Sequence, residues 1–291
     1  MHRTYQIITD ATADMVPEML VGLPEVQVIP MGVTLGEKAY TYGPGGDITV
    51  EEFYAAQRDG KFATTSQINP TVYLEHFEAC LQKGEDVLYL CLTSGVSGTF
   101  QTASLCAAEL QEKYPEGKVI CIDSLCASVG EGFLVREAAR KQKEGLTLDE
   151  LVQWVNDHRQ KVCHWFTVDD LNHLKRGGRI SATAALFGTM LSIKPVLHVD
   201  DTGHLVPVSK ARGRKASLLA LVDRMAESAV DPAGQTIFIS HGDCEADAEF
   251  VADEVRRRFG VQDIYINYVG PVIGNHSGPG TLALFFLGSQ R

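Results

Sequence analysis

Short runs of almost unbroken apolar residues alternate along the chain with longer segments of helical periodicity. Four of these runs, residues 5–9, 87–92, 119–122 and 236–240, have the length of buried strands. A strand that is apolar at nearly every position must be covered on both faces, which is typical of parallel strands in α/β proteins. The pattern therefore predicts an α/β fold that contains a doubly wound parallel sheet.

Capping signals mark the beginnings of several intervening helices. Thr49 and Thr147 each precede a glutamate by three residues, which is the spacing of a capping box. Pro70 suits the first position of a helix, where its missing N–H costs nothing. We therefore expect helices to begin directly after Thr49, at Pro70 and directly after Thr147.

The pattern changes after about residue 160. Residues 193–199 and 204–209 flank the turn at 200–203 and predict a hairpin, and further helices are expected around 215–229 and 244–259. We predict two domains: an N-terminal α/β domain with the parallel sheet (residues 1–160) and a C-terminal α/β domain with a mixed sheet (residues 161–291). Because no linker rich in Pro, Gly or Ser separates them, we expect extensive contact between the two.

The composition excludes several classes of protein. The 291 residues carry a formal net charge of −11, which argues against broad binding of nucleic acid, since that needs a basic face. Seven scattered cysteines without a C-x-x-C pair suggest neither a disulfide framework nor a zinc site. With no signal-peptide apolar core at the N-terminus and no apolar run long enough for a bilayer, we expect a soluble cytoplasmic protein.

A turn rich in hydroxyls and glycines, residues 93–99, joins one predicted strand to a helical pattern. A helix N-terminus offers free N–H groups to an anion, and glycine lets a ligand approach the backbone closely. The turn has neither the lysine of a phosphate-binding loop nor the elbow of a serine hydrolase. Its four hydroxyls, more than one cap requires, predict a site for a small anion such as a carboxylate.

Four other polar clusters are candidates for binding. Residues 9–14 follow the first strand and could either cap a helix or contact a ligand. The hydroxyls of residues 64–66 could cap the Pro70 helix or donate to a carboxylate, and we favour ligand contact. Residues 174–181 hold three cations around two glycines, either as a solvated basic loop or for capture of an anion or an acidic partner. Residues 270–281 predict a rigid glycine- and proline-rich loop that presents His276 as a donor, a general base or a phosphate neighbour.

A catalytic function has less support in the sequence than a binding function. No spacing of histidines and carboxylates predicts a metal site. A triad from Ser94 or Ser97, His276 and an aspartate such as Asp10 is conceivable because triads are defined by geometry and not by order. The serine lacks the strained elbow, so an esterase or acyltransferase that uses Ser94 and His276 is a secondary hypothesis.

Five of these segments, in this order, resemble those of the DegV family, whose members include the fatty-acid-binding subunits of bacterial fatty acid kinase. The resemblance runs essentially from end to end. It lies in the motifs T-D-A-T-A-D (9–14), T-S-Q (65–67), T-S-G-V-S-G-T-F-Q-T-A (93–103), L-K-R-G-G-R-I-S (174–181) and G-P-V-I-G-N-H-S-G-P-G-T (270–281). It implies a two-domain α/β protein that encloses one long-chain fatty acid, such as palmitate, stearate or oleate, between its domains and uses no cofactor.

The resemblance also implies roles for individual residues. By motif position, Thr65 and Ser94 would bind the carboxylate of the fatty acid, and Arg179 and His276 would present it to a kinase. Three neighbours in the same motifs are expected near the ligand: Ser66, Ser97 and Gly98.

The partner that the resemblance implies is a separate kinase with a dihydroxyacetone-kinase-like domain, which would phosphorylate the bound acid to an acyl phosphate. The chain itself would be a carrier and not an enzyme, and transient membrane contact is compatible with that role. A regulatory protein that senses its lipid occupancy, without phosphoryl transfer, is the alternative.

Overall fold

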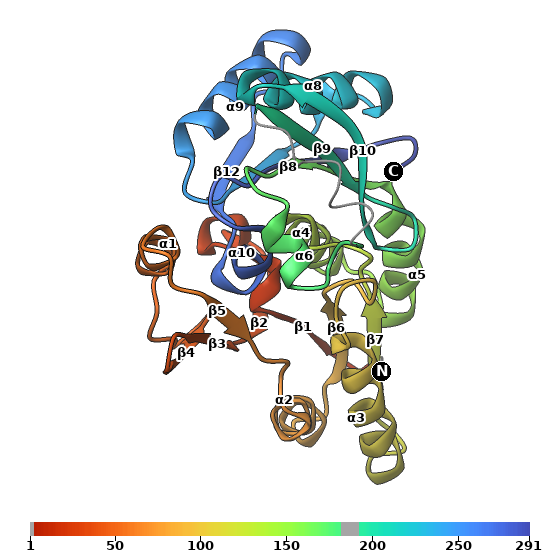
Figure 1. Ribbon diagram of the computed structural model, residues 1–291. Coiled ribbons are helices and arrows are strands. Elements are labelled where there is room, and N and C mark those ends of the chain that lie inside the picture. Colours follow the sequence, from red (N-terminus) through yellow and green to blue (C-terminus); the bar gives the residue numbers. More distant parts are fainter. Residues whose placement is uncertain (1–2, 182–191) are drawn as a thin grey trace.

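The computed structural model describes residues 3–181 and 192–291 and contains a parallel sheet in the N-terminal half of the chain (Figure 1). The strand order is β2-β1-β6-β7, and every neighbouring pair is parallel. The strands are β1 (Tyr5–Asp10), β2 (Val26–Ile29), β6 (Asp86–Cys91) and β7 (Val119–Asp123). Two short 3₁₀ helices, η1 (Ala11–Ala13) and η2 (Pro17–Leu20), lie between β1 and β2. The parallel sheet predicted from the apolar runs is therefore present.

Helices cover both faces of this sheet. Ile8 and Tyr89 belong to a core with residues of α2 and α3, whereas Ile7 and Leu88 belong to a core with residues of α4 and α5. The helices are α2 (Pro70–Gln82), α3 (Thr99–Lys113), α4 (Val129–Lys143) and α5 (Leu148–His158). Since neighbouring residues of a strand point to opposite faces, burial on both faces explains why these strands are apolar throughout.

A mixed sheet occupies the C-terminal half, with strand order β10-β9-β8-β13-β11-β12. Only β11 and β12 pair in parallel, and the other neighbours are antiparallel. Its strands are β8 (Val162–Thr167), β9 (Ile193–Val199), β10 (Leu205–Arg212), β11 (Ile237–His241), β12 (Ile264–Tyr268) and β13 (Leu282–Leu287). Helices α8 (Arg214–Ser228) and α9 (Glu245–Phe259) pack on one face of it, shown at the top of Figure 1.

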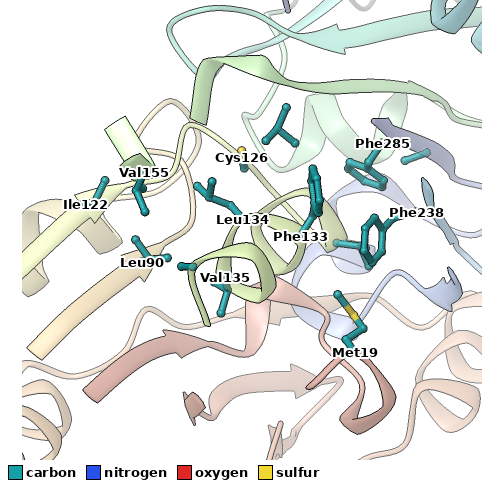
Figure 2. Packing of buried hydrophobic residues seen from close by; sticks show 14 of the residues in the cluster. Met19, Leu90, Ile122, Cys126, Phe133, Leu134, Val135, Val155, Phe238 and Phe285 are labelled. Atoms are coloured by element: carbon teal, nitrogen blue, oxygen red, sulfur yellow. The ribbon is translucent and has the colours of Figure 1, made fainter. Parts of the chain in front are cut away.

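Helix α4 joins the parallel sheet to the other face of the mixed sheet. Its residue Phe133 packs against Phe238 of β11, with ring centroids 5.0 Å apart, and Phe285 of β13 lies beside them (Figure 2). Leu134 and Val135 of the same helix belong to the core that includes Leu90 of β6. Helix α4 therefore makes part of the extensive contact that we expected between the two halves.

A third, three-stranded sheet was missed by the sequence prediction. Its order is β4-β3-β5, with all pairs antiparallel, and it follows β2 in the chain. The strands are β3 (Met31–Leu35), β4 (Lys38–Tyr42) and β5 (Ala63–Thr65), and α1 (Val50–Arg58) connects β4 to β5. Strand β5 ends at Thr65, one of the residues that the sequence predicts to bind the ligand.

Several local predictions are confirmed. Both capping boxes are formed, at Thr49 and at Thr147, and Pro70 is the first residue of α2. The predicted hairpin is the pair β9 and β10. The proposed capping of α2 by residues 64–66 is not found, because the side chain of Asn69 caps that helix.

The segment predicted as a rigid loop around His276 is partly a helix. Residues 271–277 form α10 (Pro271–Ser277), with Pro271 in its first turn and Gly278 at a positive φ of 82° after its end. Proline at the start and glycine just after the end are favourable helix boundaries, so the residues that suggested a loop instead delimit a short helix.

The predicted domain boundary at residue 160 falls within the 3₁₀ helix η3 (Arg159–Lys161), directly before β8, and it stays a prediction.

Candidate ligand-binding site

A cavity lies between the carboxyl end of the parallel sheet and the inner face of the mixed sheet. It contains about 930 Å³ of space free of protein atoms, part of it open to solvent. Most of its wall is apolar, formed by Met31, Leu92, Val96, Ala127, Phe166, Leu174, Val199, Leu205, Val269, Val272, Ile273, Ala283 and Phe285. The cavity is therefore suited to a ligand that is largely apolar.

One corner of the cavity gathers polar residues from three distant segments. Oγ1 of Thr65, at the end of β5, lies 3.0 Å from Nε2 of His276 in α10. Both residues line the cavity, as do Ser66 and Arg179. The guanidinium of Arg179 donates from Nε to the backbone carbonyl of Val96 at 3.2 Å, and also to that of Gly177. Four of the residues singled out in the sequence thus meet at one place.

The polar corner depends on a close backbone approach at Gly177. A Cβ at this position would lie 2.5 Å from Nδ1 of His276, which is shorter than any ordinary contact. Gly177 directly follows α6 (Asn172–Arg176), whose residue Leu174 also lines the cavity. The glycine in the basic motif is therefore required by packing against the imidazole.

His276 is neutral at physiological pH. Burial, and secondarily the nearby positive charge of Arg179, lower the pKa of His276 to about 4. A neutral imidazole has one N–H donor and one acceptor nitrogen. If Nε2 carries the proton, it donates to Thr65 Oγ1, and the Thr65 hydroxyl is then free to donate to a ligand. The corner can thus offer neutral donors to an anion without placing a formal charge on the histidine.

The hydroxyls of the turn at residues 93–99 do not all face the cavity. Ser97 lines it, and its Oγ lies 2.9 Å from Thr99 Oγ1. Thr93 instead donates to the carbonyl of Gly203 at 3.1 Å and accepts from the N–H of Gly95, which ties the turn to the β9–β10 hairpin.

The two other residues expected at this turn lie differently. Ser94 is absent from the lining among the described residues, and its backbone N–H donates to Asp123 Oδ1 at 3.2 Å. Gly98 is the residue before α3. It lies under the side chain of Gln67, whose Nε2 would be 2.7 Å from a Cβ there. The turn thus brings Ser97, rather than Ser94, to the cavity wall.

Comparison with known proteins identifies the family. A model of the DegV family, described as an uncharacterised protein family, matches residues 4–289. The chain belongs to the DegV family. A DegV domain-containing protein of Clostridium perfringens is similar to it, with 42% identity over 289 residues and 99% of each chain covered.

Solved DegV structures share the fold over nearly the whole chain. A fatty-acid-binding DegV family protein of Thermus thermophilus has a TM-score of 0.85 at 29% identity, with 98% of this chain and 99% of that chain covered. The fatty acid kinase (Fak) B3 protein of Streptococcus pneumoniae, loaded with linoleic acid, has the same TM-score and coverage at 22% identity, which shows a common fold.

The first DegV motif, residues 9–14, forms part of a buried polar network. Asp10 caps η1 by accepting from the N–H of Thr12 and also accepts from the Tyr89 hydroxyl at 2.5 Å. Thr9 and Thr12 donate to the two carboxylate oxygens of Glu131, at 3.0 and 2.9 Å. Burial raises the pKa of Asp10, and that of Glu131 well above its usual range. Of the two interpretations left open for this motif, the structure supports a capping and packing role.

The basic motif at residues 174–181 is divided between cavity and surface. Arg179 turns inward, whereas the guanidinium of Arg176 stacks on the exposed ring of Phe62, 4.3 Å from its centroid. Phe62 lies three residues before Thr65, so this cation–π pair sits close along the chain to the polar corner. Part of the motif is thus an exposed surface beside the corner.

Sequence reasoning missed several polar residues that line the cavity. Ser128 precedes α4, His164 is in β8 and Ser240 is in β11. His164 and Ser240 alternate with apolar neighbours that pack on α8 and α9, and this alternation was the one sequence signal that these two side chains face the other side of the sheet.

In residues 3–181 and 192–291, no group of His, Cys, Asp and Glu is arranged to hold a metal ion, and no helix has the length and apolarity needed to cross a membrane.

Proposed function

We propose that this DegV protein binds one long-chain fatty acid, with the acyl chain in the apolar cavity and the carboxylate at the polar corner. The observation that carries the proposal is the Thr65–His276 pair at one corner of a largely apolar cavity of about 930 Å³. The fatty acids bound by the Thermus and Streptococcus neighbours support it.

The energetics of such a site are favourable. Burial of each methylene contributes about 0.8 kcal/mol, so a chain of about 16 carbons gains on the order of 10 kcal/mol before the entropic cost of binding. A buried carboxylate must be hydrogen bonded, and the hydroxyls of Thr65 and Ser97 are neutral donors on the cavity wall. Neutral donors suit a carboxylate that must later react, because a tight ion pair would stabilise the unreacted anion. The guanidinium of Arg179 lies in the same corner, and it already donates to the backbone carbonyls of Val96 and Gly177.

Recovery of the bound lipid tests the proposal directly. The protein is purified from a bacterial host, denatured in organic solvent, and the extract is analysed by mass spectrometry. We expect about one equivalent of a fatty acid with roughly 14 to 18 carbons per chain. An extract without fatty acid, from protein that also fails to take up added stearate after delipidation, would refute the proposal.

The serine that holds the carboxylate is open to a paired test. The family resemblance favours Ser94, whereas the cavity lining favours Ser97, and the two side chains lie three residues apart in one turn. Ser97→Ala and Ser94→Ala are therefore matched variants. We expect Thr65→Ala and Ser97→Ala each to weaken binding of stearate by about 1–3 kcal/mol, and Ser94→Ala to do so less. A larger loss with Ser94→Ala would return the assignment to Ser94.

We further propose that the protein is a carrier that presents its fatty acid to a separate kinase and does not itself catalyse a reaction. The Streptococcus neighbour, a component of fatty acid kinase, supports this role. In the present protein, the surface beside the polar corner carries Arg176 and the exposed Phe62, and this surface is our candidate for the contact with the kinase. With a dihydroxyacetone-kinase-like fatty acid kinase and ATP, we expect formation of acyl phosphate, and Arg179→Ala should reduce that reaction more than it reduces lipid binding. An equal loss in both assays would assign Arg179 to binding alone.

Two other functions give different results in these assays. A lipid-dependent regulatory protein would bind fatty acid but yield no acyl phosphate with the kinase. An esterase that uses Ser94 and His276 would show a burst or a covalent adduct with an activated acyl ester. The esterase has less support than the carrier, because the structure pairs His276 with Thr65 and not with Ser94.

All seven cysteines are unpaired, which supports our proposal that the protein acts in the reducing cytoplasm.

A further inference from the structure

A second group of polar side chains lies on the cavity wall apart from the polar corner. Two of its members are on the inward face of the mixed sheet. The strand register aligns Ser240, Ala283 and Phe166 in one row, and Phe238, Phe285 and His164 in the next. The two rows are successive positions on the same face, about 7 Å apart along the strands. His164 and Ser240 thus lie among apolar side chains that surround the acyl chain of the proposed ligand.

Ser128 completes this second group. Its Oγ donates to Asp14 Oδ2 at 2.5 Å and lies 3.3 Å from Oγ of Ser240. The backbone of Ser128 has a φ of 53°, a conformation that costs energy for a residue with a side chain. Packing therefore holds the Ser128 hydroxyl in the cavity wall, although a residue with a side chain prefers a negative φ.

His164 has an unused hydrogen-bond acceptor. Its side chain is buried, and Nδ1 lies 2.9 Å from the carbonyl oxygen of Val162. Because a carbonyl can only accept, Nδ1 carries the proton and Nε2 carries a lone pair. Burial, helped by the positive charge of Arg291, lowers the pKa of His164 well below its usual range, so the ring stays neutral. Nε2 has no hydrogen-bond partner among the described residues.

The bare backbone of Gly130 makes room for this imidazole. A Cβ on Gly130 would lie 2.1 Å from Nε2 of His164, so the ring edge that carries the acceptor settles against the first turn of α4, two residues from Ser128. Phe285 lies on the same side, because the same Cβ would be 2.8 Å from its Cδ1, and its ring is edge-on to the imidazole with centroids 5.2 Å apart. A buried acceptor without a partner is costly, and a hydroxyl that donates to it removes that cost.

We propose that His164, Ser128 and Ser240 form a polar subsite that recognises a hydroxyl group on the acyl chain, so that the protein selects hydroxylated long-chain fatty acids over plain ones. The inference rests on the proposed function and specifies its ligand. The ligand hydroxyl donates to Nε2 of His164 and lies near the two serine hydroxyls. A ligand without a hydroxyl leaves Nε2 unpaired, which is a basis for discrimination against it.

The test compares the dissociation constants of stearic acid and of its 3-, 10- and 12-hydroxy derivatives for delipidated protein. The readout is the ratio of the two constants for each isomer, which cancels general effects of a variant on the cavity. For the wild type we expect at least one isomer to bind more tightly than stearic acid. His164→Leu should reduce that preference by about tenfold or more, and the milder Ser240→Ala by a smaller factor.

The outcomes separate the two proposals. If stearic acid itself fails to bind, both the proposed function and this inference are wrong. If stearic acid binds but every isomer binds more weakly, the inference alone is overturned, and a buried water is the better partner for His164. A preference for one isomer that both correctly folded variants retain unchanged would also overturn it, since the preference would then arise elsewhere in the cavity.

Discussion

Replacement of Asp14 by asparagine should change how the stability of the protein depends on pH. Asp14 is only 2% exposed, and its Oδ2 accepts from the Ser128 hydroxyl at 2.5 Å. Burial, with a smaller contribution from the charge of Asp10, raises the pKa of Asp14 from 3.8 to about 7. Asparagine resembles the protonated carboxyl in shape and cannot ionise, so Asp14→Asn isolates the contribution of this one group.

The sign follows from the raised pKa. Between about pH 4 and pH 7 the folded protein retains a proton on Asp14 that the unfolded chain has already lost. The free energy of unfolding therefore falls as the pH rises through this window and levels off above it. A rise from 3.8 to about 7 corresponds to an upper bound of about 4 kcal/mol, because each pKa unit is worth about 1.4 kcal/mol. Relaxation of the site will reduce this figure.

Urea unfolding of delipidated protein at pH 5, 6, 7 and 8 measures the effect. Relative to the wild type, Asp14→Asn should become progressively more stable from pH 5 to pH 8, by a few kcal/mol in all. Asp253→Asn is the matched control, because the Asp253 side chain is 76% exposed and, among the described residues, its ion pair is with Arg256 of the same helix. A stability difference between wild type and Asp14→Asn that is the same at pH 5 and pH 8 would refute the reasoning.

Three further predictions concern His276, its packing and the helix caps. Because the pKa of His276 is lowered to about 4, its ring resonances in an NMR titration should not move between pH 5.5 and 8, and a midpoint near 6.5 would contradict the buried position. Gly177→Ala should weaken fatty acid binding and destabilise the protein by about 1–3 kcal/mol in thermal unfolding, since its Cβ would lie 2.5 Å from His276 Nδ1; an unchanged affinity would show that the imidazole can move aside. Thr49→Ala and Thr147→Ala should each cost about 1 kcal/mol of stability by removing a capping box, with fatty acid affinity unchanged, and a loss of affinity would show that the caps act on the cavity.

The fold could be predicted from the sequence where apolar runs and helix-capping residues agree with the observed burial. The parallel strands are apolar because helices cover both their faces, and the starts of α1, α2 and α5 follow from side-chain caps and one proline. The sheet β4-β3-β5 was not predictable. Its edge strand β4 is largely exposed and β5 has three residues, so their pairing depends on contacts distant in sequence.

The polar corner was predictable in content but not in detail. The sequence motifs predicted Thr65, Arg179 and His276 as site residues, and the structure brings these three together from segments far apart in the chain. Which serine of the turn faces the cavity could not be read from the sequence, because Ser94 and Ser97 differ only in the direction that the turn gives their side chains. The polar residues deeper in the cavity were missed for a related reason, since a strand pattern gives the face of a side chain but not what lies opposite it.

The position of α4 connects the buried acids to the proposed ligand site. The start of this helix carries both Ser128, in the cavity wall, and Glu131, in the acid network beside the parallel sheet. One turn further on, Phe133 packs on the mixed sheet. A change in the charge of Asp14 would therefore act on Ser128 directly, through their hydrogen bond, and through Ser128 on the cavity wall. While Asp14 is protonated, this hydrogen bond holds the Ser128 hydroxyl in place, and ionisation of Asp14 near pH 7 would change the charge beside it.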